Sequence, residues 1–127
     1  MQVVDRSFAA NQYARAKQEL ARDVCGFGFA REWPVSWQGA MDIDSGPIIP
    51  GLQLSTGSSG LAFVGASAFG DRDYLRKLLA AVYLGGFPVR RRGELKFCAS
   101  NQVGDAVLLY ALTLGPLWQE IDRRTTQ

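Results

Sequence analysis

Residues 46–69, which read GPIIPGLQLSTGSSGLAFVGASAF, decide the fold class that the sequence predicts. The stretch has no charged residue, and its side chains are apolar or small almost all the way round a helix. Such a helix is buried on most sides, and its small residues let neighbouring elements approach closely. A cap from Asp44 or Ser45, with Pro47 in the first turn, favours a helix over residues 47–69.

An uncharged stretch of this length also has to be weighed as a membrane span. Gln53 and the hydroxyl and glycine residues between positions 55 and 60 favour a protein interior instead. We therefore expect the segment to be covered by protein and do not expect a membrane partner.

The composition indicates one globular domain without nucleic-acid chemistry. The 127 residues are 47% hydrophobic and 20% charged, with a net charge of +2. The run Arg90-Arg91-Arg92 is read as a solvated loop, so no nucleic-acid partner is predicted. Histidine is absent, which excludes Ser-His-Asp and Cys-His nucleophiles and every His-based zinc site. We expect no metal and no cofactor.

Cys25 and Cys98 lie far apart and belong to no recognisable motif. No secretory signal is visible at the start of the sequence, so the expected compartment is the cytoplasm by default. In a reducing compartment the two cysteines are predicted to be free, partly buried thiols.

The hydrophobic periodicity predicts four helices, over residues 5–24, 47–69, 71–85 and 101–114. In the third, apolar residues form a stripe opposite charged ones, after Asp71 as the N-cap. A short extended piece is expected over 94–98, and Gly115-Pro116 is expected to end the fourth helix. Residues 25–46 then form a long loop of the kind that commonly carries function.

An almost uniformly apolar helix that alternates with amphipathic ones is typical of stacked antiparallel helical hairpins. The predicted fold class is therefore all-α, with residues 1–127 as a single helical domain. Asp105 stands among apolar neighbours in the fourth helix, where an unpaired charge would be costly to bury. We expect it to have an arginine or hydroxyl partner.

From about Phe27 onward the chain resembles the C-terminal part of uncharacterised bacterial proteins of the α/α-toroid class. The resemblance rests on GFGFAREWP at 26–34, MDIDSGPI at 41–48, GASA at 65–68, Gly70-Asp71 and GDAVLL at 104–109. The Asp-x-Asp-Ser-Gly-Pro element is its most specific part. Six-hairpin toroids include glycoside-processing enzymes and a terpenoid dehydratase-isomerase, so the resemblance implies a partial toroid derived from a hydrolase or lyase.

The acidic pair Asp42 and Asp44 is the first candidate catalytic group. Near a helix N-terminus the ionised carboxylate is favoured, which suits a general base or a nucleophile. The alternative for Asp44, with Ser45, is a plain helix cap. The alternative for Asp42 is a hydrogen-bonded position in the loop.

Glu32 is the third catalytic candidate, because the aromatic residues beside it would desolvate its carboxyl and raise its pKa. Paired with Asp42 across a cleft, it would give the two carboxyl groups that glycoside cleavage uses. Trp33 and Trp37 are candidates for a sugar-stacking platform. The alternatives are a surface ion pair for Glu32, for instance with Arg31, and simple packing of the loop for the two tryptophans.

Two functions remain open on the sequence. In the first, the chain is a toroid fragment without independent catalysis, which lacks an N-terminal portion and derives from an enzyme acting on a carbohydrate or small organic substrate. In the second, it is a noncatalytic helical module that associates with itself or with a partner, and association with a membrane is one form of this alternative. The second function predicts association in solution.

Overall fold

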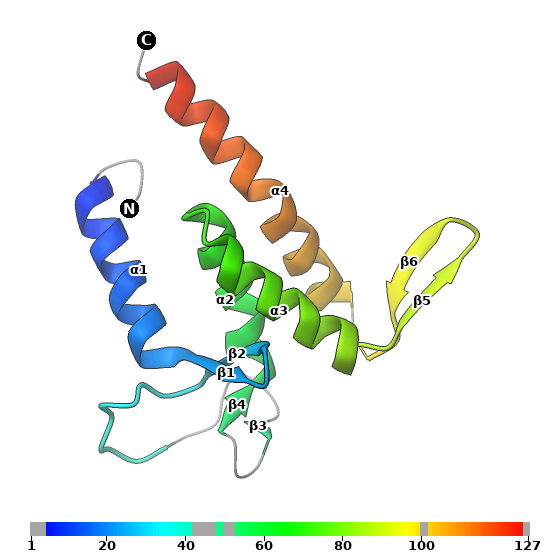
Figure 1. Ribbon diagram of the computed structural model, residues 1–127, viewed down its shortest axis with the longest axis horizontal. Helices are drawn as coiled ribbons and strands as arrows, with labels where there is room; N and C mark the ends of the chain where they lie inside the picture. Colours follow the sequence, from blue (N-terminus) through cyan, green and yellow to red (C-terminus); the bar gives the residue numbers. More distant parts are fainter. Residues whose placement is uncertain (1–4, 42–47, 50–52, 100–101, 126–127) are drawn as a thin grey trace.

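The computed structural model describes residues 5–41, 48–49, 53–99 and 102–125, and its elements are shown in Figure 1. The helices are α1 (Arg6–Leu20), α2 (Thr56–Ala68), α3 (Arg72–Gly85) and α4 (Gln102–Thr125). The strands are β1 (Ala21–Val24), β2 (Phe27–Arg31), β3 (Ile48–Ile49), β4 (Leu54–Ser55), β5 (Pro88–Arg91) and β6 (Glu94–Phe97).

The fold is mixed α/β, so the all-α prediction of stacked helical hairpins in a partial toroid is wrong. Strands β1 to β4 form one antiparallel sheet in the order β1-β2-β4-β3. Strands β5 and β6 form a separate antiparallel hairpin. Helices α2 and α3 pack on the first sheet and on each other, and α4 packs on α2, as Figure 1 shows.

The first error concerns residues 5–24, where the predicted helix ends early. Helix α1 stops at Leu20, and residues 21–24 continue as β1, which pairs with β2 inside the predicted loop. A two-residue turn at Cys25 and Gly26, with φ of 53° and 86°, joins the two strands. Two positive φ values define the hairpin turn whose twist matches that of the flanking strands.

The second error concerns residues 47–69. Ile48–Ile49 and Leu54–Ser55 are paired strands, and the helix occupies only Thr56–Ala68. Ser55 marks the change, because its backbone belongs to β4 while its Oγ accepts a hydrogen bond from the Ser58 N–H at 3.1 Å. An uncharged run of small and apolar residues has no periodicity that separates a buried strand from a buried helix, and the helix was therefore predicted too long.

Helix α3 agrees with its prediction, and α4 extends beyond it. Asp71 caps α3 by accepting a hydrogen bond from the Tyr74 N–H at 3.2 Å. The expected break at Gly115-Pro116 does not occur, because α4 continues through Pro116 to Thr125. Close packing on α2 accompanies this continuity: Leu114 is buried, and the Gly115 N–H donates to Ser67 Oγ at 3.2 Å.

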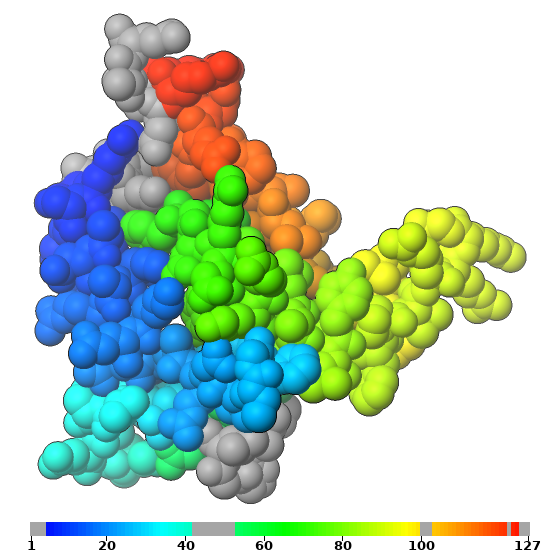
Figure 2. Space-filling view, viewed as in Figure 1, coloured from blue at the N-terminus to red at the C-terminus, as the bar shows by residue number. Residues whose placement is uncertain are grey.

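The basic run at 90–92 belongs to a β-hairpin and not to an irregular loop. Arg92 and Gly93, with φ of 53° and 86°, form the same kind of two-residue turn as Cys25 and Gly26. The expected extended piece at 94–98 is confirmed as β6. The hairpin projects from the body of the protein, as Figures 1 and 2 show.

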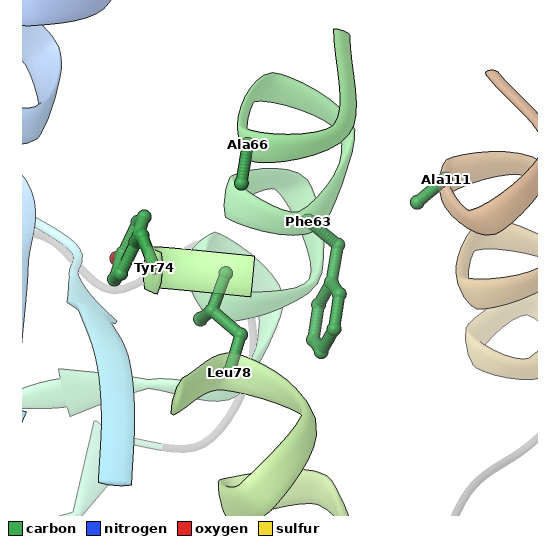
Figure 3. Packing of buried hydrophobic residues seen from close by; sticks show 5 residues of the cluster. All are labelled: Phe63, Ala66, Tyr74, Leu78 and Ala111. Carbon is green, nitrogen blue, oxygen red and sulfur yellow. The ribbon is translucent and has the colours of Figure 1, made fainter. Parts of the chain in front are cut away.

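The core lies where α2 meets α3 and α4. Phe63 and Ala66 of α2 lie between Tyr74 and Leu78 of α3 on one side and Ala111 of α4 on the other, as Figure 3 shows. All five side chains are buried. Burial of such side chains is the main favourable term in folding, and it fixes α2 as the central helix.

Candidate functional site

Of the loop predicted over residues 25–46, the structure describes residues 25–41. Asp42 and Asp44 lie outside the described residues. Glu32 and Trp33 follow directly after β2 and are half-buried, whereas Trp37 is 44% exposed. The structure brings the two tryptophans together in a stack, with ring centroids 5.1 Å apart and planes inclined by 24°.

Residues 35–40 are held against the end of α1 by hydrogen bonds. The Val35 N–H donates to the Glu19 carbonyl at 3.1 Å, and the Ser36 N–H donates to the Glu19 carboxylate at 2.9 Å. The hydrogen bond from Ser36 to the carboxylate is the largest of the causes that lower the pKa of Glu19. Trp37 Nε1 donates to the Ala40 carbonyl at 3.2 Å. Trp33 and Trp37 therefore form a fixed aromatic pair with one partly exposed ring.

The chemistry of this pair is limited by its geometry. Because the rings stack on each other, they do not form two opposite walls around a ligand. The exposed surface of Trp37 remains suited to a flat apolar or sugar surface. Glu32 belongs to the same short segment.

A polar cluster around Asp71, which the sequence did not reveal as such, joins α1 to α3. Asp71 Oδ2 accepts hydrogen bonds from Lys17 Nζ at 2.5 Å and from the Tyr13 hydroxyl at 2.8 Å. The Tyr74 hydroxyl donates to the Phe29 carbonyl at 2.7 Å, which ties α3 to β2. The Asp71 side chain is 16% exposed and that of Lys17 is 39% exposed, so the cluster is only partly shielded from water.

The electrostatics of the Asp71 cluster favour a structural role. Burial by itself raises the pKa of Asp71, but the hydrogen bonds from Lys17, Tyr13 and the Tyr74 N–H outweigh burial, and the pKa lies below its usual value. Burial, followed by the hydrogen bond to Asp71, raises the pKa of Tyr13. Burial and the Asp71 charge raise the pKa of Tyr74 to about 12. At neutral pH the carboxylate stays ionised and both phenols stay protonated, so none is poised to exchange a proton.

One part of this cluster was visible in the sequence. Asp71 was predicted as the cap of α3, and Tyr13 and Lys17 are four residues apart, which places them on one face of α1. Their meeting depends on how α1 packs against α3. No local pattern contains that information.

An open apolar groove of about 600 Å³ lies between α2 and α4. Its lining consists of Leu61, Val64, Val103, Ala106, Val107 and Tyr110. Leu61 and Val103 are 67% and 71% exposed, so the groove is bounded by apolar side chains that face water.

The groove continues along α4 as a line of exposed residues, which we call the α4 stripe. It consists of Ala106, Leu109, Tyr110, Thr113 and Leu117. Their spacing of three or four residues places them on one face of the helix. Leu109, Tyr110 and Leu117 are each more than half exposed, although Ala111 and Leu114 on another side of the same helix are buried. Helix α4 is thus apolar on two sides.

The expected thiols differ from their prediction in one respect. Cys25 and Cys98 are free, as predicted, but both are exposed and not partly buried. Cys25 occupies the turn between β1 and β2, and Cys98 follows β6. Asp105 also differs, because its Oδ1 atom is buried without a hydrogen-bond partner among the described residues.

Within the described part of the chain, no helix combines the length and the apolar character that a membrane crossing requires. The same residues contain no group of three or more Cys, Asp or Glu side chains placed to hold a metal ion. Comparisons with protein-family models, with curated proteins and with solved structures found no match to this chain.

Proposed function

We propose that this chain is a noncatalytic association module, which binds another polypeptide through the α4 stripe and the adjoining groove. The observation that carries the proposal is the exposure of large apolar side chains along one continuous face of α4 and the neighbouring edge of α2. Contiguous exposed apolar surface of this kind marks protein interaction sites.

The pattern of α4 supports this function. A helix at the surface of a globular protein normally presents polar residues on the side opposite the core. In α4 that side presents Leu109, Tyr110 and Leu117, and residues 106–119 include no charged side chain. Removing these side chains from water favours association by about 25 cal/mol for each Å² of apolar surface that is buried.

The state of the described ionisable groups is consistent with a noncatalytic role. Asp71 is ionised and held by Lys17 and Tyr13, and the raised pKa values of Tyr13 and Tyr74 keep both hydroxyls protonated. This arrangement suits a cluster that holds α1 against α3 better than it suits acid or base catalysis.

The experiment compares two lysine substitutions at exposed leucines. Leu109→Lys places a charge in the α4 stripe, and Leu84→Lys places one on α3, where the leucine is 60% exposed against 65% for Leu109. We expect the unaltered protein and Leu84→Lys to associate in light scattering and sedimentation, and Leu109→Lys to be monomeric. Equal behaviour of the two variants, or a monomeric unaltered protein with no binding partner, would reject the proposal.

A second candidate function rests on the Trp33 and Trp37 stack. We propose as the alternative that the segment from Glu32 to Asp44 binds a carbohydrate or small organic substrate, with Glu32, Asp42 and Asp44 as the groups for hydrolase or lyase chemistry. The partly exposed ring of Trp37 supports this alternative, because Val35 and Ser36 in the same stretch are hydrogen-bonded to Glu19 of α1.

Intrinsic fluorescence tests the alternative. Titration with soluble oligosaccharides should quench the tryptophan signal in the unaltered protein and in Asp42→Asn, and the response should be lost in Trp37→Ala. Turnover of the bound sugar should be lost in Asp42→Asn with little change in thermal midpoint. An unchanged fluorescence response in Trp37→Ala would exclude the tryptophan platform.

A further inference from the structure

We propose that the hairpin of β5 and β6 binds double-stranded DNA by entering a groove between the two phosphate backbones. This inference is independent of the proposed association function, because it concerns a different surface and a different partner. The sequence alone predicts no nucleic-acid partner, because residues 90–92 are read there as a solvated loop. The structure instead presents these residues on a projecting β-ribbon, as Figures 1 and 2 show.

The positive charge of the chain is concentrated in this hairpin. Residues 88–97 have a net charge of +3, from four cations and one carboxylate: Arg90, Arg91, Arg92, Lys96 and Glu94. The whole chain has a net charge of +2, so all the other residues together carry −1. Nucleic acids attract proteins mainly through their phosphates, and a local cluster of arginine and lysine is the surface that responds. Attraction to a polyanion is therefore directed to the hairpin.

The cationic side chains of the hairpin are accessible. All four are exposed. Within the described residues no ion pair joins any of them to a carboxylate, whereas Lys17, Lys77 and Arg123 each take part in one. A phosphate can therefore contact the hairpin without first breaking an ion pair. Arginine suits this contact, because its planar guanidinium can donate two parallel hydrogen bonds to phosphate oxygens.

The register of the hairpin puts positive charge on both faces of the ribbon. Successive residues of one strand point to opposite faces, so Arg90 and Arg91 lie on different faces. Lys96 lies opposite Val89, which places it on the same face as Arg91. Arg92 belongs to the turn between the two strands. Each face and the turn therefore carry at least one cation.

This distribution favours a groove over a flat surface. A membrane or a flat protein surface contacts one face of a ribbon and leaves the charge of the other face in water. A groove of duplex DNA has a phosphate backbone on each wall, so both faces meet negative charge. The apolar residues agree with this choice, because the exposed Phe87 lies at the base of the hairpin and Arg92 at its tip. Insertion into a membrane requires the apolar side chains to enter first.

The ribbon also has a size that the major groove admits. The major groove of B-form DNA is about 12 Å wide and about 8.5 Å deep, and it accepts a two-stranded β-ribbon. Strands of four residues at about 3.3 Å per residue extend about 13 Å, so β5 and β6 can span the depth of the groove. The major groove of duplex RNA is deep and narrow, which makes DNA the favoured duplex.

The base of the hairpin is fixed to the body of the protein. Phe97 is buried and packs edge-on against Tyr83 of α3, with ring centroids 5.6 Å apart. The Ala99 N–H donates to the carbonyl of Gly86, the C-cap of α3, at 3.2 Å. A Cβ atom at Gly86 would lie 2.9 Å from Phe97 Cδ1, so the packing is close. A hairpin held in this way loses little conformational freedom when it binds.

Fluorescence anisotropy with a labelled DNA duplex tests the inference in the full chain. The association constant is measured over a series of salt concentrations for the unaltered protein, Arg90→Ala, Arg91→Ala and Arg76→Ala. Each phosphate contact adds about one unit to the negative slope of the logarithm of this constant against the logarithm of salt concentration. We expect Arg90→Ala and Arg91→Ala each to reduce the slope by about one unit, because each face contacts one backbone. Arg76→Ala removes the same charge from an exposed position on α3 and should leave the slope unchanged.

The other outcomes overturn the inference. Failure to bind the duplex at low salt would exclude it. An equal effect of Arg76→Ala would show only diffuse attraction, and a loss in one hairpin variant alone would show contact through a single face, as on a flat partner. Tighter binding to phosphatidylserine vesicles than to the duplex at the same salt would assign the hairpin to a membrane surface. All three variants should keep the thermal midpoint of the unaltered protein, because the three arginines are exposed.

Discussion

The Asp71 carboxylate accepts hydrogen bonds from two side chains of α1 and from the first turn of α3. We expect Asp71→Ala to lower the free energy of unfolding by about 1–3 kcal/mol, because it leaves the first turn of α3 and the partly buried Tyr13 hydroxyl without their acceptor. Urea denaturation measures the change. Asp73→Ala is the control, since Asp73 is 69% exposed and its ion pair with Lys77 lies at the surface, where such a pair contributes little. Equal losses in the two variants would contradict the structural role of Asp71.

The same carboxylate predicts an acid dependence of stability. The pKa of Asp71 is lower in the folded protein than its usual value of 3.8, so the folded state binds the proton less tightly than the unfolded state does. Its contribution is therefore present above about pH 4 and is lost as the pH falls through the folded pKa. The stability difference between the unaltered protein and Asp71→Asn should shrink on acidification in that range.

Measuring this difference, and not the stability of one protein, isolates Asp71 from the other carboxylates. Asp5, Glu19, Asp23 and Glu120 also have lowered pKa values, and they titrate in both proteins. A stability difference that stays constant from neutral pH to pH 3 would show that the Asp71 charge has no part in holding α1.

At the scale of the elements, Gly28 controls how closely α3 packs on β2. A Cβ atom at this position would lie 2.8 Å from the backbone nitrogen of Leu78 and 2.8 Å from Lys77 Cβ. Gly28→Ala should therefore destabilise the protein by about 1–3 kcal/mol, because the helix has to move away from the sheet. Gly60→Ala in α2 is the control, since a Cβ there meets nothing within 4 Å. That change should be neutral or stabilising by up to about 1 kcal/mol, through helix propensity. A Gly28→Ala protein as stable as Gly60→Ala would mean that β2 and α3 are not tightly packed.

The elements differ in how well the sequence predicts them. Helix α3 was predicted correctly, because its apolar stripe, its cap at Asp71 and the glycines at 85 and 86 all point to the same limits. The hairpin of β1 and β2 was missed, because Leu20 and Val24 keep helical spacing and Cys25 is an unusual residue for its turn. The two residues of β4 are too few to show alternation, and their pairing with β2 and β3 is a tertiary property.

The candidate sites also differ in whether residues close in sequence or residues far apart in sequence form them. Trp33 and Trp37 are close in sequence, and their rings stack on each other, whereas a role in sugar binding stays a prediction. The two hydrogen-bond donors to Asp71, Tyr13 and Lys17, are 58 and 54 residues away in the sequence, so only the packed structure brings the three side chains together. The α4 stripe was hidden for another reason, since an apolar helix reads as buried whether its own chain or another chain covers it.

At the scale of the whole molecule, self-association makes stability depend on concentration. If two copies bury the α4 stripe only in the folded state, mass action raises the thermal midpoint as the protein concentration increases. We expect this rise in the unaltered protein and in Leu84→Lys. Leu109→Lys should show a constant midpoint, equal to the value that the unaltered protein approaches on dilution, because Leu109 is 65% exposed and has little to lose within one chain. A midpoint for Leu109→Lys that lies well below this dilute limit would show that Leu109 stabilises the single chain and does not act through an interface. A midpoint of the unaltered protein that does not change with concentration, together with a single-chain mass in solution, would exclude self-association through the α4 stripe.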